Sequence, residues 1–205
     1  MTKPVRAAEV CKEIVEGAEK GGCRALFITV DAPQLGRRER DMRHKASAES
    51  RASAQAGAAA GGKAKAGGTS AALTTFIDPS LCWDDIEWFK SITTMPIILK
   101  GVQTADDVLL AVKAGCKGVV LSNHGGRQLD GCRAGLEVLE EVMDGLAEAV
   151  AAGELTQAAV DDFHVFVDGG VRRGTDIFKA LALGARAVGM GKPVAYAMSA
   201  CEPEP

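Results

Sequence analysis

Two patterns of apolar residues alternate along the chain. Short, almost wholly apolar runs, which are typical of strands buried on both faces, occupy residues 25–30, 97–100, 118–122, 165–168 and 187–190. Stretches typical of amphipathic helices occupy residues 5–19, 84–91, 104–115, 134–152, 175–184 and 193–200. This alternation predicts an α/β fold built on a parallel sheet.

The alternation is interrupted between residues 45 and 72. This stretch consists almost entirely of Ala, Gly, Ser, Lys and a few other polar residues, and it has no apolar stripe. A segment of this composition buries too little apolar surface to offset the entropy lost on ordering it. We therefore expect a disordered loop at 45–72, inserted in a single domain that covers residues 1–205.

Length, charge and hydropathy narrow the class of protein. The chain has 205 residues, whereas a complete (β/α)₈ barrel has about 250. A formal net charge of −3 gives no indication of nucleic-acid binding. No apolar run approaches the roughly 18 residues of a membrane span, and the polar N-terminus does not begin a signal peptide. We expect a soluble, intracellular protein with no membrane span, in a compartment that the sequence leaves open.

The residues that most often bind metals are dispersed. The six cysteines include no Cys-x-x-Cys pair, and the three histidines lie far apart in the sequence. Structural zinc sites need such ligands at short, regular spacing. We therefore expect no metal site and reduced thiols without a chemical role.

Polar residues follow each predicted strand, where the functional residues of parallel α/β barrels stand. They are Thr29, Asp31, Lys100 and the segments 122–127, 168–172 and 189–192. Taken singly, such residues are commonly helix caps, solvated charges or turns. Together, the glycines of the last two segments let backbone N–H groups approach an anion, and Arg172 and Lys192 add positive charge. The combination predicts a phosphate site.

Four of these segments resemble one family. They are residues 29–39, residues 97–102, residues 121–130 with Ser-Asn-His-Gly-Gly-Arg-Gln at 122–128, and residues 167–176 with Asp-Gly-Gly-Val-Arg at 168–172. They are similar to the FMN-dependent 2-hydroxy-acid dehydrogenases, which include glycolate oxidase and flavin-linked L-lactate dehydrogenases. The resemblance implies strands four to eight of a TIM (β/α)₈ barrel, hence a partial barrel, with FMN as cofactor.

The resemblance also implies catalytic and substrate-binding residues. His124 would take a proton from a small L-2-hydroxy acid as it is oxidised to the 2-keto acid, and Asp31 would pair with the imidazolium that forms. Arg127, helped by Arg38, would hold the substrate carboxylate, because a guanidinium matches a carboxylate with two hydrogen bonds. Without its neighbours, the favoured interpretation of His124 is a satisfied structural histidine in a strand-end turn.

The cofactor-binding residues follow from the same resemblance. Lys100 would face the N1/C2 edge of the flavin, and Thr29 and Ser122 would hydrogen-bond the cofactor. The residues implied for the ribityl and phosphate groups are Asp168, Gly169, Gly170, Val171, Arg172, Gly191 and Lys192.

The chain also departs from the family. The first three barrel strands and two substrate-binding tyrosines have no counterpart, since Tyr196 is the only tyrosine, and Lys192 replaces an arginine. Five strands would leave two open edges, which predicts a fragment, a homo-oligomer or pairing with a missing N-terminal half. Two functions remain open. The chain is part of an FMN-dependent 2-hydroxy-acid oxidoreductase that is not competent without the N-terminal strands, or it is a degenerate half-barrel that binds a phosphate ligand or serves assembly without catalysis.

Overall fold

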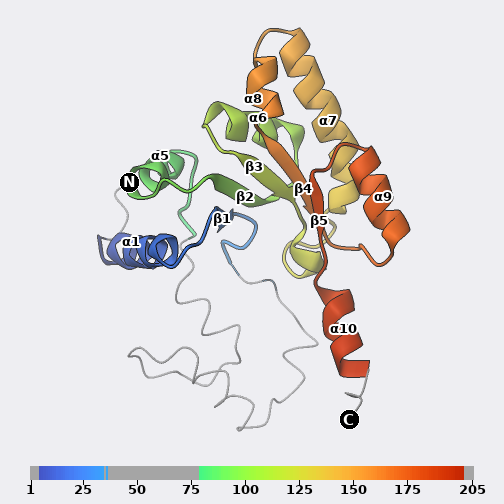
Figure 1. The fold of residues 1–205 in the computed structure, drawn as a ribbon, viewed down its shortest axis with the longest axis horizontal. Helices are drawn as coiled ribbons and strands as arrows, with labels where there is room; N and C mark the ends of the chain where they lie inside the picture. Colours follow the sequence, from blue (N-terminus) through green and yellow to red (C-terminus); the bar gives the residue numbers. More distant parts are fainter. Residues whose placement is uncertain (1–4, 35, 37–78, 201–205) are drawn as a thin grey trace.

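The computed structural model describes residues 5–34, 36 and 79–200, and within them five strands form one parallel sheet (Figure 1). Each strand pairs with its neighbours in sequence, in the order β1-β2-β3-β4-β5. The strands are β1 (Leu26–Thr29), β2 (Ile97–Val102), β3 (Gly118–Leu121), β4 (His164–Asp168) and β5 (Ala187–Gly189). They coincide with the apolar runs, which confirms the predicted parallel α/β fold.

Helices precede, connect and follow the strands. They are α1 (Val5–Lys20), α5 (Asp85–Ile92), α6 (Ala105–Lys113), α7 (Gly135–Ala151), α8 (Gln157–Asp161), α9 (Gly174–Ala182) and α10 (Lys192–Ala200). All but α8 match predicted helices to within a few residues. Helix α8 is too short for a helical period to stand out in the sequence, and the Thr156 side chain caps it by accepting from Ala159 N at 3.2 Å.

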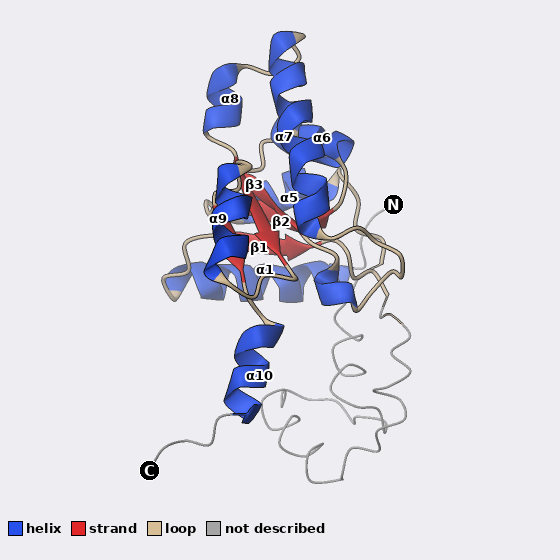
Figure 2. Ribbon diagram, turned by 90° about the vertical axis from the view of Figure 1, so that its right-hand side faces the viewer, coloured by secondary structure: helices blue, strands red, loops and turns tan. Residues whose placement is uncertain are grey.

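One face of the sheet carries the core. Side chains that alternate along the strands, such as Leu99, Val119 and Val167, are almost completely buried beneath α6 and α7. Figure 2 shows these helices on the outer side of the sheet, whereas α10 stands clear of it in both views. This outer packing is the arrangement of a (β/α) barrel, in which helices surround the strands.

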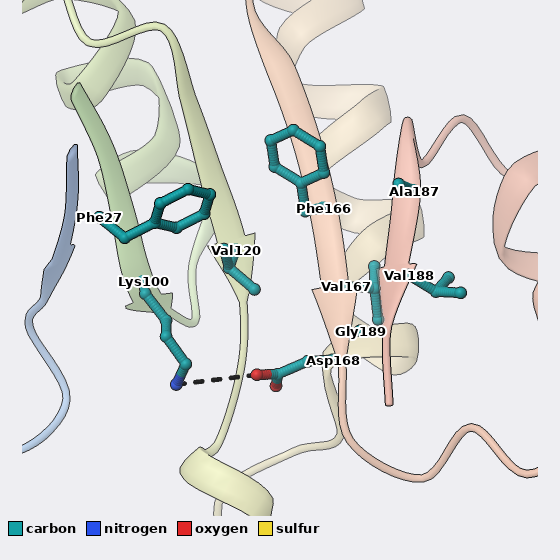
Figure 3. A pocket seen from close by; sticks show the side chains of 9 residues that line it. All are labelled: Phe27, Lys100, Val120, Phe166, Val167, Asp168, Ala187, Val188 and Gly189. Carbon is teal, nitrogen blue, oxygen red and sulfur yellow. Dashed lines mark ion pairs between the residues drawn. The ribbon is translucent and has the colours of Figure 1, made fainter. Parts of the chain in front are cut away.

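The opposite face of the sheet is an open, mostly apolar concavity of about 280 Å³ (Figure 3). Phe27, Val120 and Phe166 line it, and Lys100 and Asp168 lie at its carboxyl end. Phe27 is 52% exposed, although in a closed barrel this face would be the interior. The five strands therefore form a partial (β/α)₈ barrel, and within the described ranges β1 and β5 each pair on one side alone.

Two predictions concern residues outside the described ranges. They are the expected loop at 45–72 and the role of Arg38. Among the helices of the described ranges, none has both the length and the hydropathy needed to cross a membrane.

Candidate functional site

A strained turn after β3 presents His124 at the carboxyl edge of the sheet. His124, Gly125 and Gly126 all have positive φ (57°, 64° and 69°), and His124 is the one non-glycine residue with positive φ in the described part of the chain. Asn123 holds the turn through its side-chain oxygen, which accepts from Gly126 N at 3.0 Å. Such backbone strain is commonly found at functional sites. The two glycines allow the chain to fold back and project the imidazole into the site.

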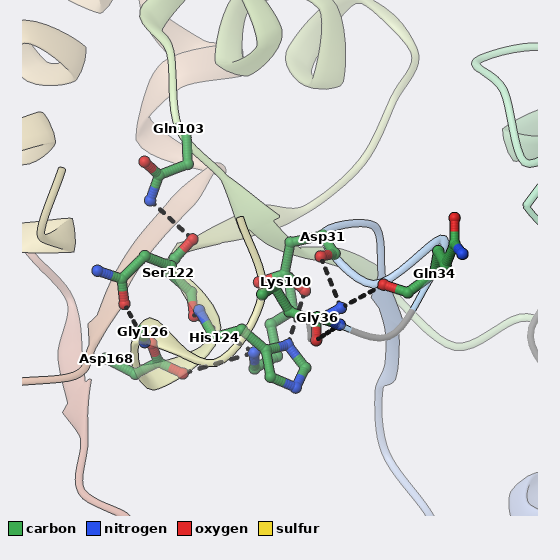
Figure 4. Close-up of polar contacts among 11 residues, drawn as sticks. Asp31, Gln34, Gly36, Lys100, Gln103, Ser122, His124, Gly126 and Asp168 are labelled. Atoms are coloured by element: carbon green, nitrogen blue, oxygen red, sulfur yellow. Dashed lines mark hydrogen bonds and ion pairs between the residues drawn. The ribbon is translucent and has the colours of Figure 1, made fainter. Parts of the chain in front are cut away.

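His124 forms a pair with Asp31, which follows β1. The Nδ1–H of His124 donates to Asp31 Oδ1 at 2.9 Å, and the two side chains are 29% and 12% exposed. Asp31 is oriented so that it fixes the tautomer of the ring, because the donor to a carboxylate must be the protonated nitrogen. Nε2 is therefore the nitrogen that can accept a proton (Figure 4).

Gly101 makes room for this carboxylate. The strand β2 has an irregular register between Lys100 and Val102, and Gly101 between them has φ 109°. A Cβ at residue 101 would lie 2.3 Å from Asp31 Cγ. Glycine is required here both by the positive φ and by the close approach of Asp31.

Lys100 links the strand ends at the centre of the site. Its Nζ donates to Ser122 Oγ at 3.3 Å and lies 3.7 Å from Asp168 Oδ2, and both Lys100 and Asp168 side chains are about one-quarter exposed (Figure 4). Ser122 Oγ also accepts from His124 N at 3.1 Å. The ammonium group is thus held between β3 and β4.

A cavity of about 920 Å³ opens beside these residues, within the usual range for ligand pockets. It is lined by the turn after β3, the loop after β4 and the start of α10, including the residues His124, Arg127, Gly169, Gly170, Val171, Arg172, Gly191 and Lys192. A Cβ at Gly170 or Gly191 would meet nothing within 4 Å, so space remains open at this wall.

The polar groups of the cavity fit a phosphorylated ligand with hydroxyl groups, as FMN is. Lys100, Arg172 and Lys192 supply positive charge, and glycine backbone lines the same wall. Asp168 Oδ1 is buried and has no hydrogen-bond partner among the described residues, so it is an acceptor suited to a ligand hydroxyl. Lys192 Nζ donates to Gly125 O at 2.7 Å, which joins this end of the cavity to the His124 turn.

The remaining predicted residues are placed as follows. Thr29 ends β1 directly beside Lys100 in the sheet register and is exposed. Ser122 is fully buried, and its hydroxyl contacts Lys100 and the His124 backbone as described above. Arg127 is exposed at the rim of the cavity.

Some residues that shape the site were missed in the sequence. Gln103 Nε2 donates to Ser122 O at 2.8 Å, and Arg133 donates to Gln103 O at 3.0 Å. Arg133 in turn bonds Glu141 of α7, and this hydrogen bond raises the pKa of Arg133 and lowers the pKa of Glu141. For Asn123, the preference of Asn for caps and turns is a signal that could have found its role. No local signal points to the other three, because their contacts join distant segments.

The fold and site together define part of a (β/α)₈-barrel enzyme whose cavity is lined by glycines and by cationic side chains. Residues 2–204 match the model of the FMN-dependent dehydrogenase family. The chain belongs to this family, whose members are oxidoreductases with FMN as cofactor.

Relatives in sequence and in structure agree with this assignment. The chain is 52% identical to an L-lactate dehydrogenase (cytochrome) of Wickerhamomyces anomalus, over 93% of this chain and 31% of that protein. It is 47% identical to a peroxisomal (S)-2-hydroxy-acid oxidase GLO4 of Oryza sativa subsp. japonica, over 93% of this chain and 49% of that protein. The recombinant flavin-binding domain of baker's yeast flavocytochrome b2 superposes with a TM-score of 0.71 at 48% identity, over 93% of this chain and 41% of that chain. The chain thus spans about one-third to one-half of the length of these relatives.

Proposed function

We propose that this chain is the C-terminal part of an FMN hydroxy-acid dehydrogenase domain that oxidises a small L-2-hydroxy acid to the 2-keto acid. The observation that carries the proposal is the 2.9 Å pair between His124 Nδ1 and Asp31 Oδ1 beside the cavity. A histidine oriented in this way by a buried carboxylate is the arrangement of a general base.

The residues of the chain divide the work of this reaction. His124 takes the substrate proton at Nε2, and Asp31 stabilises the imidazolium because the pair is mostly shielded from water. Arg127, which lines the cavity, would hold the substrate carboxylate. Arg38, two residues after Gly36 in the sequence, would assist it. FMN, when bound, would supply the acceptor for the two electrons and for the second hydrogen that the substrate loses.

The cofactor would be held by the centre and the glycine wall of the site. Ser122 and Asp168 hold the ammonium group of Lys100 in place, so its positive charge would face the cofactor. Thr29 lies beside Lys100 in the neighbouring strand. The residues that would hold the ribityl and phosphate groups are Asp168, Gly169, Gly170, Val171, Arg172, Gly191 and Lys192.

Catalysis of this oxidation requires further barrel strands that pair with the edge strands β1 and β5. The concave face that Phe27 exposes is apolar, and a barrel interior is normally filled by side chains from all its strands. The same open face favours the second candidate function, a phosphate-binding module without catalysis, if no other strands join this chain.

The test is a His124→Gln variant in a barrel completed with the N-terminal half of a relative. We expect FMN to remain bound stoichiometrically, because the His124 side chain pairs with Asp31 and not with the residues proposed to hold the phosphate, while flavin reduction by L-lactate or glycolate slows by a factor on the order of 10²–10⁴. Bound FMN is measured by absorbance and reduction by stopped flow. The matched control is His164→Gln, since His164 begins β4 at the opposite edge of the sheet.

Two results would contradict the proposal. Near-normal flavin reduction in His124→Gln with FMN bound would show that His124 is not the base. FMN binding by the unsubstituted, completed barrel without flavin reduction by any small 2-hydroxy acid would favour the phosphate-binding module.

A further inference from the structure

We propose that Gln128 is a positioning residue that holds Asp31 behind His124. This inference rests on the proposed function, in which Asp31 stabilises the protonated histidine. Gln128 lies four residues after His124 on the same segment. A contact from Gln128 to the loop that carries Asp31 therefore connects the two segments a second time, in addition to the direct hydrogen bond between His124 and Asp31.

The side chain of Gln128 makes three hydrogen bonds to the loop after β1. Its Oε1 accepts from Gly36 N at 3.0 Å, and its Nε2 donates to Gln34 O at 2.9 Å and to Asp31 O at 3.4 Å. Figure 4 shows Asp31, Gln34 and Gly36 along this one loop, next to His124. The amide therefore uses its acceptor and its donor group on the same six-residue stretch.

The hydrogen bonds of Gln128 begin at the residue where backbone pairing of β1 with β2 stops. Backbone pairing between β1 and β2 extends to Val30, whose N–H donates to Lys100 O at 2.8 Å. The next residue, Asp31, lies beyond the strand, and its carbonyl accepts from the Gln128 side chain. Because β2 lies between β1 and β3 in the sheet, the loops that carry Asp31 and His124 are not adjacent through the ladder. Gln128 joins them directly.

Gly36 provides a second constraint at the same place. A Cβ at residue 36 would lie 2.5 Å from Arg127 O and 3.0 Å from Gln128 O. The backbone of the Asp31 loop thus lies against the backbone of the His124 segment, closer than any side chain would permit. A substitution at either residue should loosen the same junction.

The first test measures the His124–Asp31 hydrogen bond in the 205-residue chain by NMR, without cofactor or substrate. In the unsubstituted chain we expect the His124 Nδ1–H proton to be protected from exchange with solvent. Gln128→Leu removes all three bonds and should speed this exchange at least about tenfold, which corresponds to about 1.4 kcal/mol of lost protection. Gly36→Ala should do the same. The matched control is Gln157→Leu, because Gln157 bonds Asp161 on the surface of α8.

Unchanged exchange in both Gln128→Leu and Gly36→Ala, with the chain folded by circular dichroism, would overturn the proposal. If one variant fails to fold, the other decides. This measurement involves no turnover, so its outcome stays separate from the success or failure of the proposed function.

The second test is a double-mutant cycle of Gln128→Leu and Asp31→Asn in the FMN-loaded, completed barrel. We expect Gln128→Leu to slow flavin reduction by about 10²-fold, the loss typical of a displacement of about 1 Å in a reacting group. FMN occupancy should not change. If Gln128 acts through Asp31, the double variant is no slower than Asp31→Asn alone to within about twofold. Losses that multiply would show that Gln128 acts independently of Asp31, and the positioning role would be wrong.

Discussion

Gly101→Ala should displace Asp31 and so impair the proposed base, His124, although His124 itself is not substituted. The new Cβ would lie 2.3 Å from Asp31 Cγ, so the carboxylate must retreat by about 1.2 Å to reach an ordinary carbon–carbon contact of about 3.5 Å. A shift of that size breaks the 2.9 Å hydrogen bond to His124, because the donor–acceptor distance of such bonds is normally about 2.7–3.2 Å. We expect flavin reduction in the completed barrel to slow by about 10²-fold.

The effect of displacing Asp31 must be distinguished from the backbone strain that alanine causes at a positive φ. Gly101 has φ 109°, and Gly153, in the turn after α7, has φ 75° with nothing within 4 Å of an added Cβ. Gly153→Ala therefore reports strain alone, expected to be about 1–2 kcal/mol in urea unfolding. Gly101→Ala should lose at least as much stability and, unlike the control, most of its activity. Equal rates of flavin reduction in the two variants would refute the argument that Gly101 makes room for Asp31.

Two further predictions concern thiol reactivity and stability, not the rate of the reaction. Burial raises the pKa of the Cys116 thiol to about 11, so at pH 8 iodoacetamide should label the exposed Cys23 first and Cys116 only after unfolding, as followed by peptide mass spectrometry. Equal labelling of the two in the folded chain would contradict the burial argument. The hydrogen bond from Arg133 lowers the pKa of Glu141, so it stabilises the fold above the usual carboxyl pKa and the contribution is lost as pH falls through the lowered value. Urea midpoints of the unsubstituted chain and Glu141→Gln should therefore differ at neutral pH and converge in acid; a constant difference would be inconsistent with this linkage.

The strands and most of the site could be predicted because both depend on local pattern. A parallel strand buried on both faces must be apolar throughout, and its carboxyl end must turn into a loop. Polar residues at those ends, such as Lys100 and Asp168, therefore meet at one edge of the sheet once the strands run in sequence order. For this reason a list of strand-end residues already contained most of the side chains that line the cavity.

The supports of the site could not be predicted because they depend on contacts between distant residues. Gln128 and Gly36 are 92 residues apart, and their hydrogen bond requires the register of three strands to be known. The need for Gly101 is visible only when the position of the Asp31 side chain is known. Helix α8 was missed for a different reason, since five residues are too few to show a helical period.

The distribution of charge across the cavity connects these local features to the proposed chemistry. Asp31 bonds Nδ1 of His124, which leaves Nε2 as the atom that would gain a proton, and Arg172 and Lys192 line the same cavity as His124. Lys100 is anchored to Ser122 and Asp168 at the centre of the site, so its charge is fixed before any ligand arrives. Charges held in place beforehand need no reorganisation during a reaction, which is the main electrostatic advantage of an enzyme site. In the proposed function, these strands would therefore carry the preorganised proton-accepting and phosphate-binding groups, and the strands that complete the barrel would supply the rest of the substrate pocket.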